Sequence, residues 1–197
     1  MKIHTIKVGP IGTNCYIAED EASREALIID PGDEAKKILG FITENGLKPK
    51  YIVITHGHWD HIGGNRELKE KLKIPIYMHK NDIFGLPYGD SPHPDKFLSE
   101  GEFFDVGGLK FEVLHTPGHT PGGISLYNVK EKVLFSGDTL FFGTYGRVDL
   151  PYSDEKAMYL SLKKLLALPP ETIVYPGHSR PTTIGAEQGL LQEFSTG

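Results

Sequence analysis

Four apolar runs in this chain each end in a loop that holds a metal-binding type of side chain. The runs span 51–54, 111–114, 133–135 and 172–175. Short apolar runs bounded by glycine and proline are typical of buried strands. Functional side chains commonly lie on loops that a rigid scaffold holds in place. The repetition therefore predicts a sheet scaffold whose strand ends converge on one polar site.

The richest loop, 55–61, places three histidines and one aspartate within a short segment. Imidazole and carboxylate groups bind zinc or iron near neutral pH. Alternation along an extended chain puts His56 and His58 on the same side. The turn that follows can bring Asp60 and His61 to a neighbouring point. One loop can therefore serve two metal ions.

Taken together, these motifs resemble the metallo-β-lactamase superfamily, and within it the small glyoxalase II-like hydrolases. The motifs are ordered along nearly the whole chain and comprise Thr13-Asn14-Cys15-Tyr16, Ile29-Asp30-Pro31-Gly32, His56 to His61, and the loops of His119, Asp138 and His178. The resemblance implies an α/β fold of the α+β type, a four-layer αβ/βα sandwich with the metal site at one edge between two sheets. It implies one domain over 1–197 that lacks the helical C-terminal domain with which full-length glyoxalase II enzymes help to bind glutathione.

Carried over by position, the resemblance implies two divalent metal ions. His56, His58 and His119 would hold the first ion, Asp60, His61 and His178 would hold the second, and Asp138 would bridge the two. Zinc is the expected metal, with iron and manganese as alternatives, because mixed histidine and aspartate sites accept all three. Two cations that share a carboxylate lower the pKa of a bridging water and give a nucleophile at neutral pH. The expected catalytic residues are Asp60 and Asp138.

The loop after the bridging aspartate bears on the substrate. Glyoxalase II enzymes have a lysine and a tyrosine there for glutathione, where this chain has Arg147 and, near the tyrosine position, Asp149. An arginine can pair with a carboxylate through two hydrogen bonds. Arg147 is therefore the expected substrate-binding residue. The expected reaction is thioester hydrolysis of the glyoxalase II type on a small molecule such as S-lactoylglutathione.

Other functions remain open. A persulfide dioxygenase of the same superfamily would use a subset of these ligands around one iron. A lactonase is an alternative because lactones and thioesters present a similar carbonyl to the same nucleophile. A flavodiiron role fits poorly, because that family has glutamate where this chain has His58. A metal-bound module without catalysis is the remaining class, and the full set of ligand-type residues argues against it.

Composition excludes several partners. The formal net charge of −5 gives no basic footprint for nucleic acid. No apolar run approaches the roughly 20 residues of a membrane helix, and the N-terminus has a strand pattern rather than that of a signal peptide. The single cysteine, Cys15, fits a reducing compartment, so the expected location is the cytoplasm. The expected partner is a small-molecule substrate, and the sequence does not specify an oligomeric state.

The pattern also predicts the main elements. Helical spacing after Asp33, the expected N-cap, predicts a helix that ends near Asn45-Gly46, and a longer helix is expected over 154–168. A short helix is expected from Gly63-Gly64 through Leu72, and with the strands that flank it, 51–55 and 75–78, it is expected to form a βαβ unit. The connection 85–101 is long enough to cover the pocket. Asp30 has two open roles, either orienting a histidine of the metal loop or capping the turn that follows it.

Overall fold

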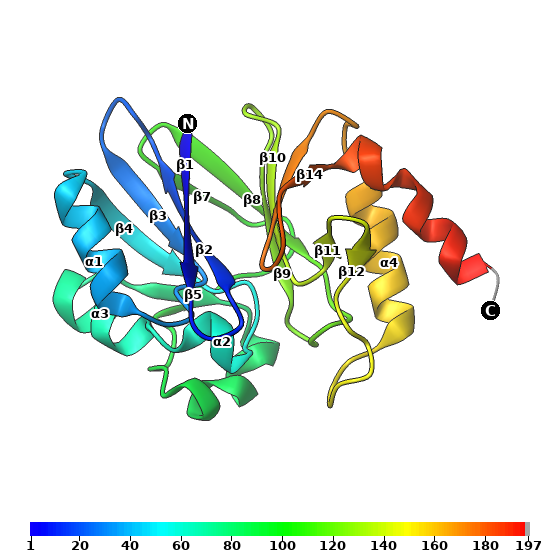
Figure 1. Cartoon of the computed structure of the whole chain (residues 1–197), viewed down its shortest axis with the longest axis horizontal. Coiled ribbons are helices and arrows are strands. Elements are labelled where there is room, and N and C mark those ends of the chain that lie inside the picture. The colour runs from blue at the N-terminus through cyan, green and yellow to red at the C-terminus, as the bar shows by residue number, and fades with distance from the viewer. Residues whose placement is uncertain (196–197) are drawn as a thin grey trace.

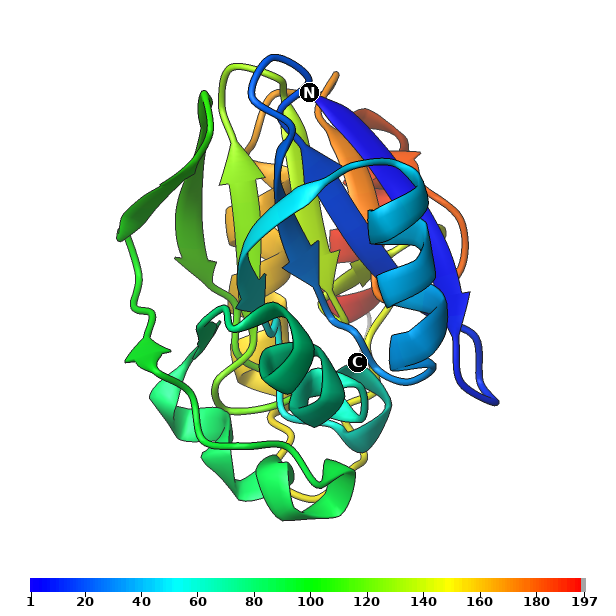
Figure 2. The ribbon, with the colours of Figure 1, turned by 90° about the vertical axis from the view of Figure 1, so that its left-hand side faces the viewer.

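Two six-stranded sheets pack against each other and carry helices on their outer faces, as Figures 1 and 2 show. The computed structural model describes residues 1–195, with side chains through residue 191. The first sheet comprises, in spatial order, β1 (Lys2–Val8), β2 (Thr13–Glu19), β3 (Glu25–Ile29), β4 (Lys48–Val53), β5 (Ile76–Met78) and β6 (Lys96–Phe97). The second comprises β14 (Thr182–Thr183), β13 (Ile173–Pro176), β10 (Val133–Gly137), β9 (Ile124–Asn128), β8 (Leu109–His115) and β7 (Phe103–Val106).

The helices cover both outer faces of this pair of sheets. They are α1 (Ala35–Glu44), α2 (Trp59–Ile62), α3 (Asn65–Leu72) and α4 (Glu155–Leu166), with 3-10 segments η1 (Lys80–Gly89) and η2 (Ile184–Ser195). A small ribbon of β11 (Leu140–Phe141) and β12 (Thr144–Tyr145) lies beside the second sheet. The four-layer αβ/βα sandwich that the sequence predicts is confirmed (Figure 1).

Strand alternation explains why this chain forms three apolar cores. On β2, Cys15 and Ile17 face the core beneath α1 and α3, while Tyr16 and Ala18 face the core between the sheets. A third core lies between the second sheet and α4. Because both faces of β2 are covered, the whole strand is buried, as expected for a central strand of a layered sandwich.

Two pairs of parallel strands bring the loops with histidine and aspartate to one edge of the sandwich. Strands β3 and β4 pair in parallel across α1, and β10 and β13 pair in parallel across α4. Each of these connections is a βαβ unit. The unit that the sequence predicts, β4 and β5 joined through α3, is confirmed as well, because β4 and β5 also pair in parallel. The carboxyl ends of β4, β10 and β13 lead directly into the loops with histidine or aspartate. These loops meet near α2, at the lower edge of the sandwich in Figure 1.

One local prediction is wrong. Asp33 does not cap α1; the N-cap residue is Glu34, which adopts a left-handed conformation without a side-chain cap. The Asp33 carboxylate instead accepts a hydrogen bond from the Glu34 N–H at 2.6 Å, so the tight turn after Pro31 delays the helix start by one residue. Helix α4 begins where the sequence predicts, and Asp154 is its N-cap, because its carboxylate accepts a hydrogen bond from the N–H of Ala157 at 3.0 Å.

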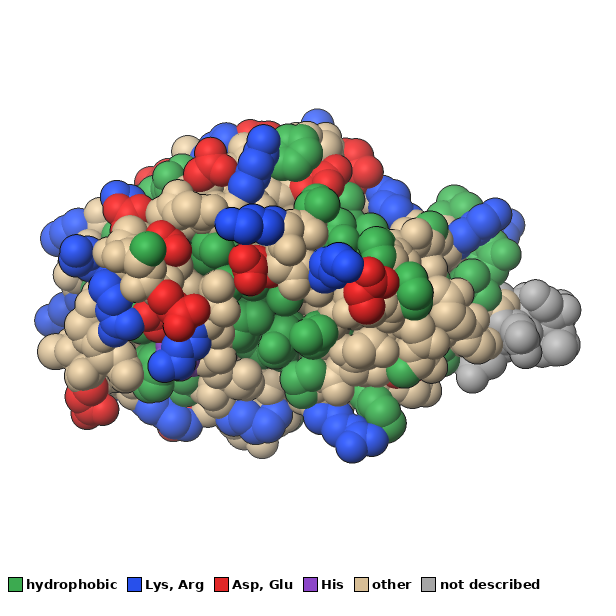
Figure 3. Space-filling view, turned by 90° about the horizontal axis from the view of Figure 1, so that it is seen from above, with side chains coloured by type: hydrophobic (Ala, Val, Ile, Leu, Met, Phe, Trp, Pro, Cys, Tyr) green, Lys and Arg blue, Asp and Glu red, His purple; other side chains and the backbone are tan. Residues whose placement is uncertain are grey.

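The opposite edge of the sandwich carries no large area of one charge. In Figure 3, which views this edge, basic and acidic side chains are interspersed around smaller apolar areas. Within residues 1–195, no helix is both long enough and apolar enough to cross a membrane.

Candidate metal centre

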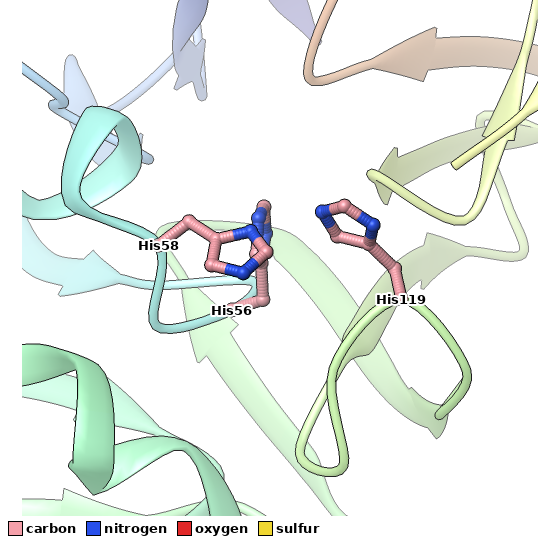
Figure 4. A group of neighbouring side chains, drawn as sticks. All are labelled: His56, His58 and His119. Atoms are coloured by element: carbon pink, nitrogen blue, oxygen red, sulfur yellow. The ribbon is translucent and has the colours of Figure 1, made fainter. Parts of the chain in front are cut away.

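Seven polar side chains from four separate loops converge at the edge of the sandwich. They form three groups whose ligand atoms lie within 4.8 Å of one another, namely His56, His58 and His119; His56, His61 and Asp138; and Asp60, His61 and His178. Figure 4 shows the three rings of the first group, with His56 and His58 coming from the loop before α2 and His119 from the loop opposite. All seven residues that the sequence singles out are thus brought together.

The Asp138 carboxylate lies at the centre of the cluster. Its Oδ2 is 3.5 Å from Nε2 of both His119 and His178, and its Oδ1 is 3.5 Å from Nε2 of His61. In the neighbouring group, Oδ2 of Asp60 is 3.2 Å from Nε2 of His178 and 3.3 Å from Nε2 of His61. The Asp138 carboxylate therefore lies close to His119 of the first group and to His61 and His178 of the third.

Unpartnered buried atoms test whether this cluster suits metal ions. Nε2 of His56, Nε2 of His119 and Oδ1 of Asp138 are buried and have no hydrogen-bond partner. Leaving such an atom unpaired costs about 1–3 kcal/mol, so native proteins rarely do so without a reason. Cations between these groups would satisfy all three atoms, because each atom has a lone pair directed at the centre. The donor set therefore fits divalent metal ions.

Polar contacts with the protein orient three of the histidines, through hydrogen bonds for His119 and His56 and through an ion-pair contact with Asp30 for His61. Nδ1 of His119 donates to the carbonyl of Arg147 at 2.8 Å. Nδ1 of His56 lies 3.2 Å from Oγ1 of Thr55, and Nδ1 of His61 lies 3.0 Å from Oδ2 of Asp30. With Nδ1 directed at the protein, Nε2 of each ring is left to face the centre, which is how metal-binding histidines are commonly oriented.

Asp30 is thus placed beside the metal loop. Its carboxylate accepts hydrogen bonds from the Thr55 N–H at 2.7 Å and the Thr55 hydroxyl at 2.6 Å. The structure therefore favours the first of its two open roles, orienting the loop and His61.

The pKa directions of His58 and Asp60 suit metal ligands at neutral pH, whereas that of His61 favours a protonated ring whose proton a metal ion would displace. Burial, followed by the neighbouring histidines, lowers the pKa of His58 to about 4, so its ring is neutral and can bind metal. Burial would raise the pKa of Asp60, but hydrogen bonds with His178 and His61 outweigh burial and hold that pKa well below its usual range. Burial would lower the pKa of His61, but the carboxylates of Asp138 and Asp30 outweigh it and raise the pKa.

Asp82, on η1, is an important residue that sequence reasoning missed. It is buried, and its Oδ2 accepts hydrogen bonds from the Gly57 N–H at 2.8 Å and the Thr120 hydroxyl at 2.7 Å. Its Oδ1 accepts a hydrogen bond from the Gly122 N–H at 2.5 Å. Gly57 separates two of the clustered histidines, and Thr120 follows His119. Asp82 therefore fastens the two histidine loops to each other.

The loop that holds His178 needs a glycine. A Cβ at Gly177 would lie 2.2 Å from Oδ1 of Asp138 and 2.7 Å from Cε1 of His61. The backbone there is held by a 2.8 Å hydrogen bond from the Gly177 N–H to the Gly137 carbonyl. The methyl group of an alanine would therefore displace two of the clustered side chains.

We expect Gly177→Ala to weaken metal binding by about 10- to 100-fold, the size of effect seen when ligand orientation is disturbed. Titration of the metal-free variant with zinc would measure the affinity. Gly40→Ala is the matched control, because a Cβ at Gly40 meets nothing within 4 Å. Unchanged zinc affinity in Gly177→Ala would contradict this view of the site.

A cavity of about 560 Å³ opens beside the cluster. Its walls include Asp60, His119, Asp138 and Arg147. Apolar side chains complete them, among them Trp59, Phe84, Tyr88, Phe141, Leu150 and Tyr152. The long connection expected at 85–101 forms part of η1 and β6, and only its first residues, around Gly85 and Tyr88, line the cavity.

Arg147 lines the cavity, as the sequence expectation requires, but it has a partner of its own. Its Nε and Nη2 atoms donate to the Asp149 carboxylate, at 2.9 Å each. Both side chains are 68% exposed. The guanidinium charge is therefore largely balanced before any substrate arrives.

The remaining histidines and the cysteine lie apart from the cluster. The rings of His79 and His115 stack on each other at 4.3 Å, and His4 is 2.7 Å from the carboxylate of Glu19. Cys15 is fully buried, and burial raises the pKa of its thiol well above its ordinary range. The thiol is therefore protonated at neutral pH and is no nucleophile.

Comparison with known families gives one match over most of the chain. The model of the metallo-beta-lactamase superfamily matches residues 8–178. A protein of Aquifex aeolicus (strain VF5) is 45% identical over 96% of this chain and 95% of its own length. The hydroxyacylglutathione hydrolase GloC of Haemophilus influenzae (strain ATCC 51907 / DSM 11121 / KW20 / Rd) is 38% identical over 95% of each chain.

Solved structures with the same fold also resemble this chain over most of its length. The BLEG-1 B3 metallo-beta-lactamase is 37% identical with a TM-score of 0.91 over 100% of both chains. TTHA1623 in a di-iron-bound form is 41% identical with a TM-score of 0.86, over 93% of this chain and 96% of that one. ETHE1 from Myxococcus xanthus is 30% identical with a TM-score of 0.86, over 97% of this chain and 83% of that one.

Proposed function

Because the chain belongs to the metallo-β-lactamase superfamily, we propose that it is a metal-dependent hydrolase of acyl thioesters, of the glyoxalase II type. The observation that carries the metal-dependent part is the group of unpartnered ligand atoms around Asp138. Zinc is the metal we propose, although the di-iron form of one relative makes iron the main alternative. The proposed partner is a small-molecule substrate.

The proposed ligands divide the cluster into two halves. One ion would be held by His56, His58 and His119, and a second by Asp60, His61 and His178, with Asp138 shared between the two. When bound, such ions lower the pKa of a water between them and polarise a substrate carbonyl.

The chain's own residues supply position and charge. Oδ2 of Asp60 accepts a hydrogen bond from the Thr13 hydroxyl at 2.8 Å, which fixes the carboxylate toward the cavity floor. Asp60 and Asp138 both line the cavity, so a carbonyl bound there lies against the two carboxylates that we propose as catalytic.

The leaving group favours a thioester. Thiols ionise near pH 8.5, so a thiolate can depart without a proton from the enzyme. Among the described residues that line the cavity, the only titratable side chains outside the proposed metal ligands are Tyr88, Tyr152 and Arg147, which are exposed. Phenol and guanidinium groups ionise only at about pH 10 and above, which is too high for an efficient general acid at neutral pH. An amide nitrogen needs such a proton far more. A thioester is therefore the substrate class whose leaving group least requires a proton from this site.

We also propose that Arg147 is the group that a carboxylate of the thiol part would meet at the cavity rim. Arg147→Ala should raise KM for S-lactoylglutathione about two- to fivefold and leave kcat nearly unchanged, because the contact is exposed and lies away from the reacting carbonyl. Asp149→Asn should act in the opposite direction and lower KM, because it frees the guanidinium. Steady-state kinetics of both variants would test this, and identical kinetics in both would remove Arg147 from the binding site.

One panel of assays separates the competing functions. Protein of measured metal content is assayed with a thioester, a γ-lactone and a β-lactam as substrates. In a separate assay, oxygen uptake is measured with glutathione persulfide as the substrate. The β-lactam is included because of the similarity to BLEG-1, and oxygen uptake because of the similarity to ETHE1. We expect the thioester to have the highest kcat/KM. Oxygen consumption without thioester hydrolysis would favour the mononuclear-iron dioxygenase, and a faster lactone would favour the lactonase.

A further inference from the structure

We propose that the cavity beside the metal centre selects thioesters in which the acyl or the thiol substituent, called an arm below, is uncharged and apolar. This arm would bind against an aromatic mouth formed by Trp59, Phe84, Tyr88 and Tyr152. This inference rests on the proposed thioesterase function and names the substrate class within it. The four residues come from α2, from η1 and from the loop before α4, and all of them line the same cavity.

The exposure of these rings is unusual for side chains of this size. Tyr88 is 80% exposed, Tyr152 70% and Trp59 47%. Single exposed apolar residues are ordinary on a protein surface, but a cluster of them beside a polar site marks a binding surface. Aromatic rings offer a large contact area with few rotatable bonds, so they bind flat or aliphatic groups at a low entropic cost.

The backbone of the mouth is held in an uncommon conformation. Tyr152 has a φ of 70°, in the left-handed region that few residues other than glycine occupy. Its ring contacts that of Phe84 with the centroids 4.8 Å apart, which joins the loop before α4 to η1 across the cavity. Strained residues persist where the surroundings hold them, and they cluster at ligand sites.

The charged side chains that line the cavity favour an uncharged arm. Arg147 is the only lysine or arginine among the described residues that line the cavity, and its guanidinium is paired with Asp149. A carboxylate on the thiol part would therefore meet this one cation, which Asp149 already balances in part, while an apolar arm would cover Tyr88 and Tyr152. Either the acyl arm or the thiol arm can supply this apolar group, because both extend from the same carbonyl.

Matched thioesters test the two arms separately. For the acyl arm, hexanoyl-N-acetylcysteamine is compared with acetyl-N-acetylcysteamine. For the thiol arm, the acetyl ester of phenylmethanethiol is compared with acetyl-N-acetylcysteamine. A fully buried methylene is worth about fourfold in binding, so four added methylenes in an open cavity should raise kcat/KM about tenfold or more.

The variant that tests the mouth is Tyr88→Ala combined with Tyr152→Ala. Both side chains are highly exposed, so their removal should disturb the fold little, which metal content and the unfolding midpoint would check. Phe103→Ala is the matched control, because Phe103 is an exposed aromatic residue on β7, outside this cavity. We expect the double variant to reduce the tenfold preference to about threefold or less, and we expect the Phe103→Ala control to keep both the preference and the rate on the acetyl ester.

Each outcome decides a different point. A preference in one substrate pair that the double variant loses supports the aromatic mouth and identifies the arm. Equal kcat/KM within both pairs, or a preference that the double variant retains, overturns the inference and leaves the thioesterase function intact. If the metal-loaded wild type hydrolyses none of the thioesters, the proposed function fails, and the inference fails with it.

Discussion

Replacing Asp138 with alanine should lower kcat/KM for thioester hydrolysis by about 10³- to 10⁴-fold. The Asp138 carboxylate would hold both proposed ions in place, and its loss should remove several kcal/mol of the transition-state stabilisation that these ions supply. Oδ2 of Asp138 lies 3.5 Å from Nε2 of both His119 and His178, so the substitution removes a carboxylate oxygen from both proposed ligand sets. The variant should also bind fewer metal ions. Kinetics together with elemental analysis would measure both effects.

Cys15→Ala is the matched control for Asp138→Ala. Cys15 is buried with a protonated thiol, so its loss should cost about 1–2 kcal/mol of stability and leave activity and metal content unchanged. A Cys15→Ala protein that folds and binds metal but loses activity would contradict the proposed mechanism. So would an Asp138→Ala protein with near-normal turnover.

Asp82→Ala should destabilise the fold by about 2–6 kcal/mol, a large part of the stability of an ordinary domain. The change leaves the N–H groups of Gly57 and Gly122 and the hydroxyl of Thr120 without their buried acceptor, at about 1–3 kcal/mol for each unpaired group that water does not reach. Both histidine loops should loosen together, so metal affinity should fall as well. Denaturant unfolding of the metal-free protein would isolate the effect on stability.

Asp105→Ala provides the comparison for Asp82→Ala. Asp105 is an exposed aspartate on β7, and its loss should change the free energy of unfolding by less than about 0.5 kcal/mol. If Asp82→Ala unfolds at the same denaturant concentration as Asp105→Ala, the hydrogen bonds of Asp82 do not hold the loops.

The sequence predicts the long elements well because their signals are local. The apolar runs that become β4, β8, β10 and β13 alternate or are fully apolar, and a glycine or proline lies at the end of each or within four residues after it. The two-residue strands β6 and β14 carry no such pattern, because tertiary pairing alone defines them. The Asp33 prediction failed for a similar reason, because the conformation of the turn before α1 is set by packing.

The clustering of the seven metal-type side chains follows from four motifs, each readable within a few residues. Asp82 was missed because its partners lie 25 to 40 residues away along the chain, and nothing near it in sequence marks it. The aromatic mouth was missed because isolated aromatic residues in loops have no periodicity. The sequence indicates that an acid at Asp149 disfavours an anionic ligand, but only the side-chain geometry reveals that Asp149 pairs directly with Arg147.

Stepwise metal reconstitution tests the central claim most directly. The protein is stripped with a chelator, zinc is added back in measured equivalents, and thioester hydrolysis is followed at each step. We expect no activity in the metal-free protein and full activity at two bound ions per chain, with Asp138→Ala failing to recover. A chelated protein that still hydrolyses the thioester, or one with two bound zinc ions that hydrolyses none, would contradict the claim.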